Sequence, residues 1–157
     1  MNKIVLASLS LLAASISPVA MADNAADAPV QFLNSASSAA ANLPFSDAVR
    51  VGDMLFLSGQ IGVDPETDVL VSGGIKPEAR QTMENIRSSL KTYGYAMSDV
   101  IKCTVMLADM SEWQAFNEIY VSFFPKPYPA RGAFGATGLA LHARVEVECI
   151  AVPAHRS

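Results

Sequence analysis

The sequence predicts an α+β domain, in which two amphipathic helices cover one face of a mixed β-sheet. Several short segments alternate apolar and polar residues, a period that is typical of strands. Two longer segments carry apolar residues at helical spacing and are interspersed among the strands. At 157 residues with 51% hydrophobic content, the chain suits one compact domain with a substantial core.

The first predicted elements form a β-hairpin. Phe45–Val51 and Met54–Gln60 have the composition of strands, and the glycine-containing pair at 52–53 separates them by a two-residue turn. Gly59 lies at the end of the second strand. A glycine there permits close approach of a backbone or a ligand, and a strand-end kink explains it equally well. A short strand follows at Val69–Val71.

A helix is predicted between Pro77, which favours the first helical turn, and Gly94, which ends the helix. Its apolar residues occupy one face only, so we expect the helix to lie on a sheet. The stripe comprises Ala79, Met83, Ile86, Leu90 and Tyr93.

Val100–Leu107 alternates as a further strand and leads into the second helix. This helix carries aromatic residues at helical spacing, which we interpret as core rather than as a ligand site. They are Trp113, Phe116, Tyr120 and Phe123. Asn117 is the polar exception in the stripe, and a buried amide there needs a hydrogen-bonding partner.

Charged residues mark the last two predicted strands. Pro129 biases the chain toward extended geometry and places Arg131 just inside a strand. Val145–Val152 alternates apolar and polar residues, so Glu146 and Glu148 share one face. Two carboxylates on such a strand are either solvated or line a cleft, and solvation is the commoner case.

The sheet face opposite the helices also needs cover. The side chains expected on it make the face only partly apolar; they are Met54, Phe56, Thr104 and Met106. A semi-apolar face of this kind predicts burial against another subunit.

The N-terminus has the pattern of a secretory signal peptide. Lys3 precedes the apolar run Ile4–Ala14, and Ala20–Ala22 supplies the small residues that signal peptidase recognises. We therefore expect residues 1–22 to be a signal peptide cleaved after Ala22, with a retained N-terminal tail as the alternative. Export to a periplasm follows from this interpretation. Residues 23–42, rich in Ala, Ser and Asn, are expected to be a flexible leader, and 43–157 the folded domain.

The net charge argues against one class of function, and the cysteines and histidines bear on disulfide and metal sites. A net charge of −4, with scattered basic residues, argues against a nucleic-acid surface. In an oxidising compartment Cys103 and Cys149 can pair. Both fall on the apolar phase of their strands, and we favour two free buried thiols. His142 and His155 have no third ligand at a plausible spacing, so no metal site is expected.

Several motifs occur in order along residues 43–153. They are Ser58-Gly59-Gln60-Ile61, the helix with Gln81, Asn85 and Ile86, Asn117 with Tyr120, Phe123 and Phe124, Pro129-Ala130-Arg131, and Val145–Glu148 with Ile150–Val152. As a set they resemble the RidA/YjgF family of reactive-intermediate deaminases. The resemblance implies a chorismate-mutase-like α+β fold and a homotrimer with three clefts between subunits. It also implies hydrolysis of imines or enamines of the 2-iminopropanoate and 2-iminobutanoate type to 2-keto acids and ammonia, without a cofactor.

The resemblance carries the family's site residues onto this chain position by position. The carboxylate-binding arginine falls on Arg131, and the glutamate that handles water falls on Glu146. The strand-end glycine falls on Gly59 and the cleft asparagine on Asn117.

Two substrate-binding positions depart from the family pattern. Ala133 stands where many active members have cysteine, and Phe45 where they have tyrosine. Losing a thiol and a hydroxyl removes hydrogen-bonding groups from the cleft and is expected to alter turnover.

The chemistry of the residues agrees with an imine hydrolase. A guanidinium such as that of Arg131 grips a carboxylate bidentately, and a carboxylate such as that of Glu146 can activate water and return the proton to ammonia. Two alternatives stay open: a module that binds a small carboxylate without turnover, and a chaperone-like trimer. A ribonuclease is disfavoured by the acidic charge.

Overall fold

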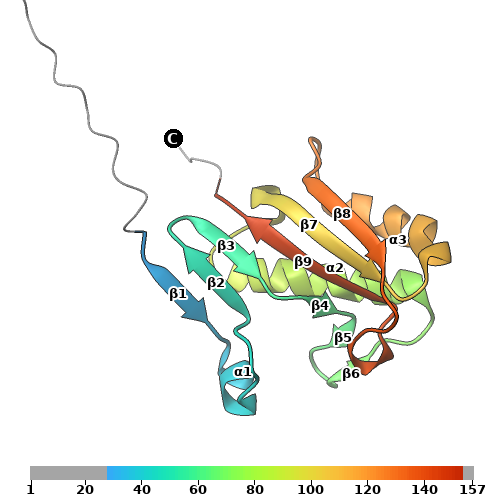
Figure 1. The fold of residues 1–157 in the computed structure, drawn as a ribbon, viewed down its shortest axis with the longest axis horizontal. Helices are drawn as coiled ribbons and strands as arrows, with labels where there is room; N and C mark the ends of the chain where they lie inside the picture. The colour runs from blue at the N-terminus through green and yellow to red at the C-terminus, as the bar shows by residue number, and fades with distance from the viewer. Residues whose placement is uncertain (1–27, 154–157) are drawn as a thin grey trace, which may run out of the picture.

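The computed structural model describes residues 28–153, and Figure 1 shows one large sheet with the longer helices behind it. The strands are β1 (Val30–Leu33), β2 (Ala48–Val51), β3 (Met54–Leu57), β4 (Gln60–Ile61), β5 (Val63–Asp64), β6 (Val69–Leu70), β7 (Val100–Leu107), β8 (Ala130–Gly135) and β9 (Val145–Ala151). The α-helices are α1 (Ala36–Ala41), α2 (Ile75–Thr92) and α3 (Trp113–Tyr120). Short 3-10 turns span Met97–Asp99, Met110–Glu112, Val121–Phe123 and Ala140–His142.

The large sheet is mixed. Its strands lie in the order β1-β2-β3-β9-β7-β8, and β4 extends the pairing along β9. The pairs are antiparallel except for β7 and β8, which run parallel. β5 and β6 form a separate two-stranded ribbon. The prediction of an α+β fold with two helices on one face of a mixed sheet is therefore confirmed.

The core lies between the sheet and α2. Alternate residues of the strands point toward the helix and are fully buried, as the two-residue period requires. The apolar stripe of α2 meets them, with Ala79, Met83, Ile86 and Leu90 at 0% exposure. Gly94 ends the helix in a left-handed conformation at φ 87°, as predicted. Within residues 28–153 no helix is long and apolar enough to cross a membrane.

The side of the sheet that faces away from α2 is here termed the open face. It carries the strand residues that alternate with the buried ones. Met54 and Phe56 are each 37% exposed, and Thr104 and Met106 are half-buried. The face is thus semi-apolar, as predicted from the sequence. Its burial against a second subunit stays a prediction.

The N-terminal part of the domain corrects the expected boundary. β1 pairs antiparallel with β2, from Val30 opposite Val51 to Leu33 opposite Ala48. The Ser35 N–H donates to the Asp47 carboxylate at 2.8 Å, which fastens the start of α1 to the hairpin. The prediction of a flexible leader up to residue 42 is wrong for residues 30–42. A four-residue strand inside an Ala/Ser-rich stretch is too short to show a period. The predicted signal peptide lies outside the described residues.

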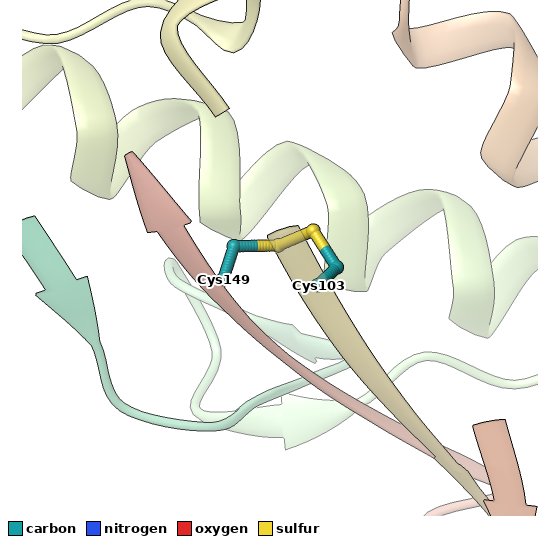
Figure 2. Close-up of a disulfide and its surroundings, with 2 residues drawn as sticks. All are labelled: Cys103 and Cys149. Atoms are coloured by element: carbon teal, nitrogen blue, oxygen red, sulfur yellow. A yellow bond between two sulfur atoms is a disulfide. The ribbon is translucent and has the colours of Figure 1, made fainter. Parts of the chain in front are cut away.

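A disulfide joins Cys103 on β7 to Cys149 on β9, under α2 (Figure 2). The expectation of two free thiols is therefore wrong. The two residues are direct partners in the antiparallel pair, with their Cα atoms 4.1 Å apart. Each cysteine lies among the apolar, buried residues of its strand, which is why the sequence favoured free thiols. The same position turns both side chains to the helix side of the sheet, where they lie directly opposite each other.

Removing this cross-link is expected to destabilise the domain strongly. The bond spans a sequence separation of 46 residues. Closing a loop of that size lowers the entropy of the unfolded chain and corresponds to about 4 kcal/mol of stability. A Cys103→Ala/Cys149→Ala variant, compared with the oxidised protein by urea unfolding, should show that loss. Equal stability of both proteins would contradict a structural role for the bond.

Candidate active site

The six predicted site residues fall into two groups on opposite faces of the sheet. Directly opposed residues of neighbouring strands point to the same face. Arg131 opposes Cys103, which is buried on the helix side, whereas Glu146 opposes Met106 on the open face. Because Cys103 and Met106 are three positions apart on β7, their side chains point in opposite directions.

Arg131 lies on β8, the edge strand of the sheet, and is half-buried. Its guanidinium reaches α3, where three residues surround it. The Nη1 group donates to Asn117 Oδ1 at 2.8 Å. The guanidinium carbon lies 4.6 Å from the ring centroid of Trp113 and 4.6 Å from that of Tyr120. We term Trp113, Asn117 and Tyr120 the arginine cradle.

The arginine cradle is electrically neutral. Among residues 28–153, no carboxylate forms an ion pair with Arg131. Burial raises the pKa of Tyr120 to about 12, an effect that the neighbouring Arg131 partly offsets, so the phenol stays protonated at neutral pH. The positive charge of Arg131 is therefore held in place without being neutralised, which suits the binding of an anion.

Ala133 follows Arg131 by two positions on β8 and so points to the same side of the sheet. It is exposed and opposes Val105. Its methyl group provides a small apolar surface beside the arginine and no hydrogen-bonding group.

Glu146 meets Gly59 on the open face. β4 pairs with β9 so that Ile61 opposes Glu146. A Cβ atom added to Gly59 would lie 1.9 Å from Glu146 Oε1 and 2.8 Å from its Cδ. Gly59 therefore leaves the space that the Glu146 carboxylate occupies, which is the first of the two explanations that its position at a strand end left open.

The change Gly59→Ala is expected to displace the Glu146 carboxylate while the fold is retained. The clash falls on the far end of a flexible side chain, so rotation of Glu146 relieves it at little cost in stability. Misplacing a reacting group by about 1 Å costs roughly 10- to 100-fold in rate, and we expect such a loss of turnover. Steady-state kinetics beside a thermal melt provide the check. Full turnover in a folded Gly59→Ala protein would show that the carboxylate position is not critical.

Phe45 lines a hollow of the surface together with Val49, which opposes Phe56 of the open face. Phe45 as a whole residue is 54% exposed. The segment that carries it runs alongside the end of β3, where the Ser58 hydroxyl donates to the Ser46 carbonyl at 2.6 Å. Phe45, Gly59 and Glu146 thus belong to one group, and Arg131, Asn117 and Ala133 to the other.

One protomer consequently does not bring Arg131 and Glu146 into a common cleft. Their closeness in sequence is misleading, because β7 lies between β8 and β9 in the sheet and the two side chains leave it in opposite directions.

Two features of the site were not anticipated from the sequence. The first is the contact of Trp113 and Tyr120 with Arg131. The sequence indicates only a core role for these two rings, although the need of Asn117 for a partner pointed to the same helix face.

The second is Glu78 on α2, a buried carboxylate that accepts hydrogen bonds from the backbone N–H groups of Arg144 at 2.6 Å and Val145 at 3.3 Å. It ties α2 to the start of β9, just before Glu146. No period or motif marks such a contact, since it joins residues far apart in the chain.

A family model described as endoribonuclease L-PSP matches residues 35–153. The chain belongs to this family, which is the RidA/YjgF family that its motifs resemble.

Individual relatives sharpen the assignment. The chain is 40% identical over 122 residues to a goat (Capra hircus) protein named 2-iminobutanoate/2-iminopropanoate deaminase, covering 78% of this chain and 89% of the relative. It is 41% identical over 108 residues to the chloroplastic Reactive Intermediate Deaminase A of Arabidopsis thaliana. That match covers 69% of this chain and 58% of the plant protein's length.

Solved structures agree with the fold. RidA from a Psychrobacter species superposes with a TM-score of 0.69 at 36% identity, covering 78% of this chain and 94% of that one. E. coli TdcF, solved with bound serine, superposes with a TM-score of 0.67 at 32% identity, covering 71% and 90% of the two chains.

Proposed function

We propose that the protein hydrolyses imines and enamines of small amino acids, of the 2-iminopropanoate and 2-iminobutanoate type, to 2-keto acids and ammonia. The observation that carries this proposal is the guanidinium of Arg131, which forms no ion pair with any described residue and is held in a neutral cradle where a planar carboxylate can bind it. The name of the goat relative supports the reaction. The serine bound to TdcF, itself a small amino acid with a carboxylate, supports the substrate class.

In the proposed mechanism Arg131 binds the substrate carboxylate and so fixes the plane of the adjacent C=N group. An enamine first takes a proton on carbon to give the protonated imine. Glu146 accepts a proton from water as the oxygen attacks the carbon of this C=NH2+ group, which gives a neutral carbinolamine. Glu146 returns that proton to the nitrogen, and as the C–N bond breaks it takes the hydroxyl proton, so that the C=O bond of the 2-keto acid forms and ammonia leaves and is protonated by Glu146. No redox change and no cofactor is required.

The proposed site is completed between subunits of a homotrimer, with Arg131 of one subunit facing Glu146 of its neighbour. The opposite orientation of the two side chains in one protomer supports this arrangement. The semi-apolar open face supports burial against a second copy.

The experiment is release of ammonia and keto acid from freshly generated 2-iminopropanoate. Wild-type protein should accelerate release above the spontaneous rate. Arg131→Ala should lower kcat/KM by about 100-fold, because truncating one partner of a charged hydrogen-bonded pair costs roughly 2–5 kcal/mol. Arg87→Ala is a matched control, since Arg87 also lies over an aromatic ring, that of Phe123. No acceleration by a folded wild-type trimer would overturn the proposal.

A second candidate function is binding of a small carboxylate without turnover. Ala133 and Phe45 favour it, because neither offers a hydrogen-bonding group to the reacting centre. Saturable binding of 2-oxobutanoate without acceleration of imine hydrolysis would select it. The family description names an endoribonuclease, but a net charge of −4 argues against RNA as the substrate of this chain.

We further propose that the protein is exported, with residues 1–22 as a cleaved signal peptide. The disulfide between Cys103 and Cys149 supports an oxidising compartment. N-terminal sequencing of the protein recovered from its host should begin at Asp23. A chain recovered with Met1 intact would contradict export by this route.

A further inference from the structure

We propose that Trp113 and Tyr120 are positioning residues for Arg131: their rings both contact the guanidinium, restrain it and thereby set the affinity for the substrate carboxylate. This inference rests on the proposed function for its kinetic test and adds a role to an aromatic stripe otherwise explained as core. In this proposal, residues of α3 fix the orientation of the Arg131 side chain, which extends from β8.

The spacing on α3 defines the geometry. Trp113, Asn117 and Tyr120 stand at positions i, i+4 and i+7, which lie on one helix face. The guanidinium carbon lies 4.6 Å from the ring centroid of Trp113 and 4.6 Å from that of Tyr120. The guanidinium therefore contacts both rings of this helix face, and Asn117 Oδ1 accepts a hydrogen bond from its Nη1 group.

The rings restrain the arginine in a way that a carboxylate partner does not. An ion pair would occupy the N–H groups that the substrate needs and would neutralise their charge. Aromatic faces attract the cation through its flat side and leave its edges free. With one edge on Asn117 Oδ1, the remaining N–H groups form a fixed fork for a planar carboxylate.

A purely structural role predicts something different. Tyr120 is 3% exposed and packs on Phe116 and Phe124, with ring centroids at 5.7 and 4.8 Å, so its loss will also cost stability. A residue that acts only through packing should lower the unfolding midpoint and leave the KM of the folded protein unchanged. A positioning residue should raise KM, and only while Arg131 is present.

The kinetic experiment therefore uses Trp113→Leu and Tyr120→Leu with 2-iminobutanoate. Each should raise KM by about 5- to 30-fold and change kcat by less than about threefold, the range expected for losing one partly desolvated cation–π contact. Trp113→Phe and Tyr120→Phe keep a ring and should recover most of the affinity lost in the leucine variants. The Tyr120 hydroxyl has no hydrogen-bonding partner in the described part of the chain, so the ring is the relevant group. Phe123→Leu is the matched control, because Phe123 lies over Arg87 and not over Arg131.

Coupling to Arg131 is tested in an Arg131→Met background, which keeps the length of the side chain and removes its charge. Trp113→Leu should have no further effect on kcat/KM there. An equal fold-change in both backgrounds would show that Trp113 acts independently of Arg131 and would overturn the proposal.

An equilibrium measurement separates this inference from the deaminase activity. Trp113 is the single tryptophan of the chain, so its fluorescence reports on the cradle. Titration with butanoate should change the emission saturably, whereas butan-1-ol should not, and Arg131→Met should abolish the change.

The two proposals then fail separately. Turnover without the KM effect in the leucine variants overturns the positioning role and leaves the deaminase standing. A saturable, Arg131-dependent fluorescence change without turnover overturns the deaminase and supports the cradle as a carboxylate site. Absence of both turnover and the fluorescence change overturns both.

Discussion

Replacing Glu146 by glutamine is expected to reduce kcat by roughly 10²- to 10⁴-fold, the range for losing a general acid–base group. Glutamine has nearly the same shape, so it fits the space beside Gly59 and preserves the strand pairing of β9. It accepts no proton at neutral pH and returns none to the departing ammonia. The measurement is single-turnover release of ammonia from 2-iminopropanoate at saturating protein.

Glu148→Gln provides the matched control. Glu148 lies two positions further along β9, on the same face, and is exposed. Removing its charge changes the local field by the same amount but leaves the Glu146 carboxylate in place. A similar loss in both variants would point to a general electrostatic effect of the open face, and normal kcat in Glu146→Gln would exclude acid–base catalysis by this residue.

Mixing two inactive variants is expected to restore activity if the site forms between subunits. In trimers assembled at random from equal amounts of Arg131→Ala and Glu146→Gln chains, about one quarter of the interfaces combine an intact arginine with an intact glutamate. The mixture, dissociated and reassembled together, should therefore recover up to about a quarter of wild-type turnover. Each variant carried alone through the same treatment should stay inactive.

The control for this mixture is Arg131→Ala combined with the double variant Arg131→Ala/Glu146→Gln, which contains no intact arginine and should recover nothing. A mixed sample of the two single variants that is trimeric and still inactive would contradict the shared site. It would leave the two groups of residues on opposite faces without a common substrate.

The fold followed from periodicity because strands and helices bury one face in a regular pattern. The stripe of α2 and the alternation of β7 and β9 were readable at once, and the glycine at 94 marked a true helix end. β1 was missed, since four residues carry too little period and its pairing with β2 is a long-range contact.

The site was only half predictable. Sequence motifs predict roles for Arg131 and Glu146, but the directions of the two side chains depend on which strand lies between β8 and β9, and the strand order is set by packing of the whole sheet. The disulfide depends on the register of β7 against β9, which brings Cys103 opposite Cys149. The arginine cradle could be predicted only from the position of β8 relative to α3. Each of these facts concerns a pair of distant segments, on which local patterns carry no information.

The disulfide has a practical consequence for any laboratory preparation. Arg131, Cys103 and Cys149 form one row across three strands, so the cross-link lies one strand away from the arginine. Protein expressed in a reducing cytoplasm will contain two thiols in that row, and protein expressed in an oxidising compartment will contain the bond. Preparations from the two compartments are thus chemically different molecules next to the proposed substrate-binding arginine, and rates measured on them are comparable only after the thiols have been counted.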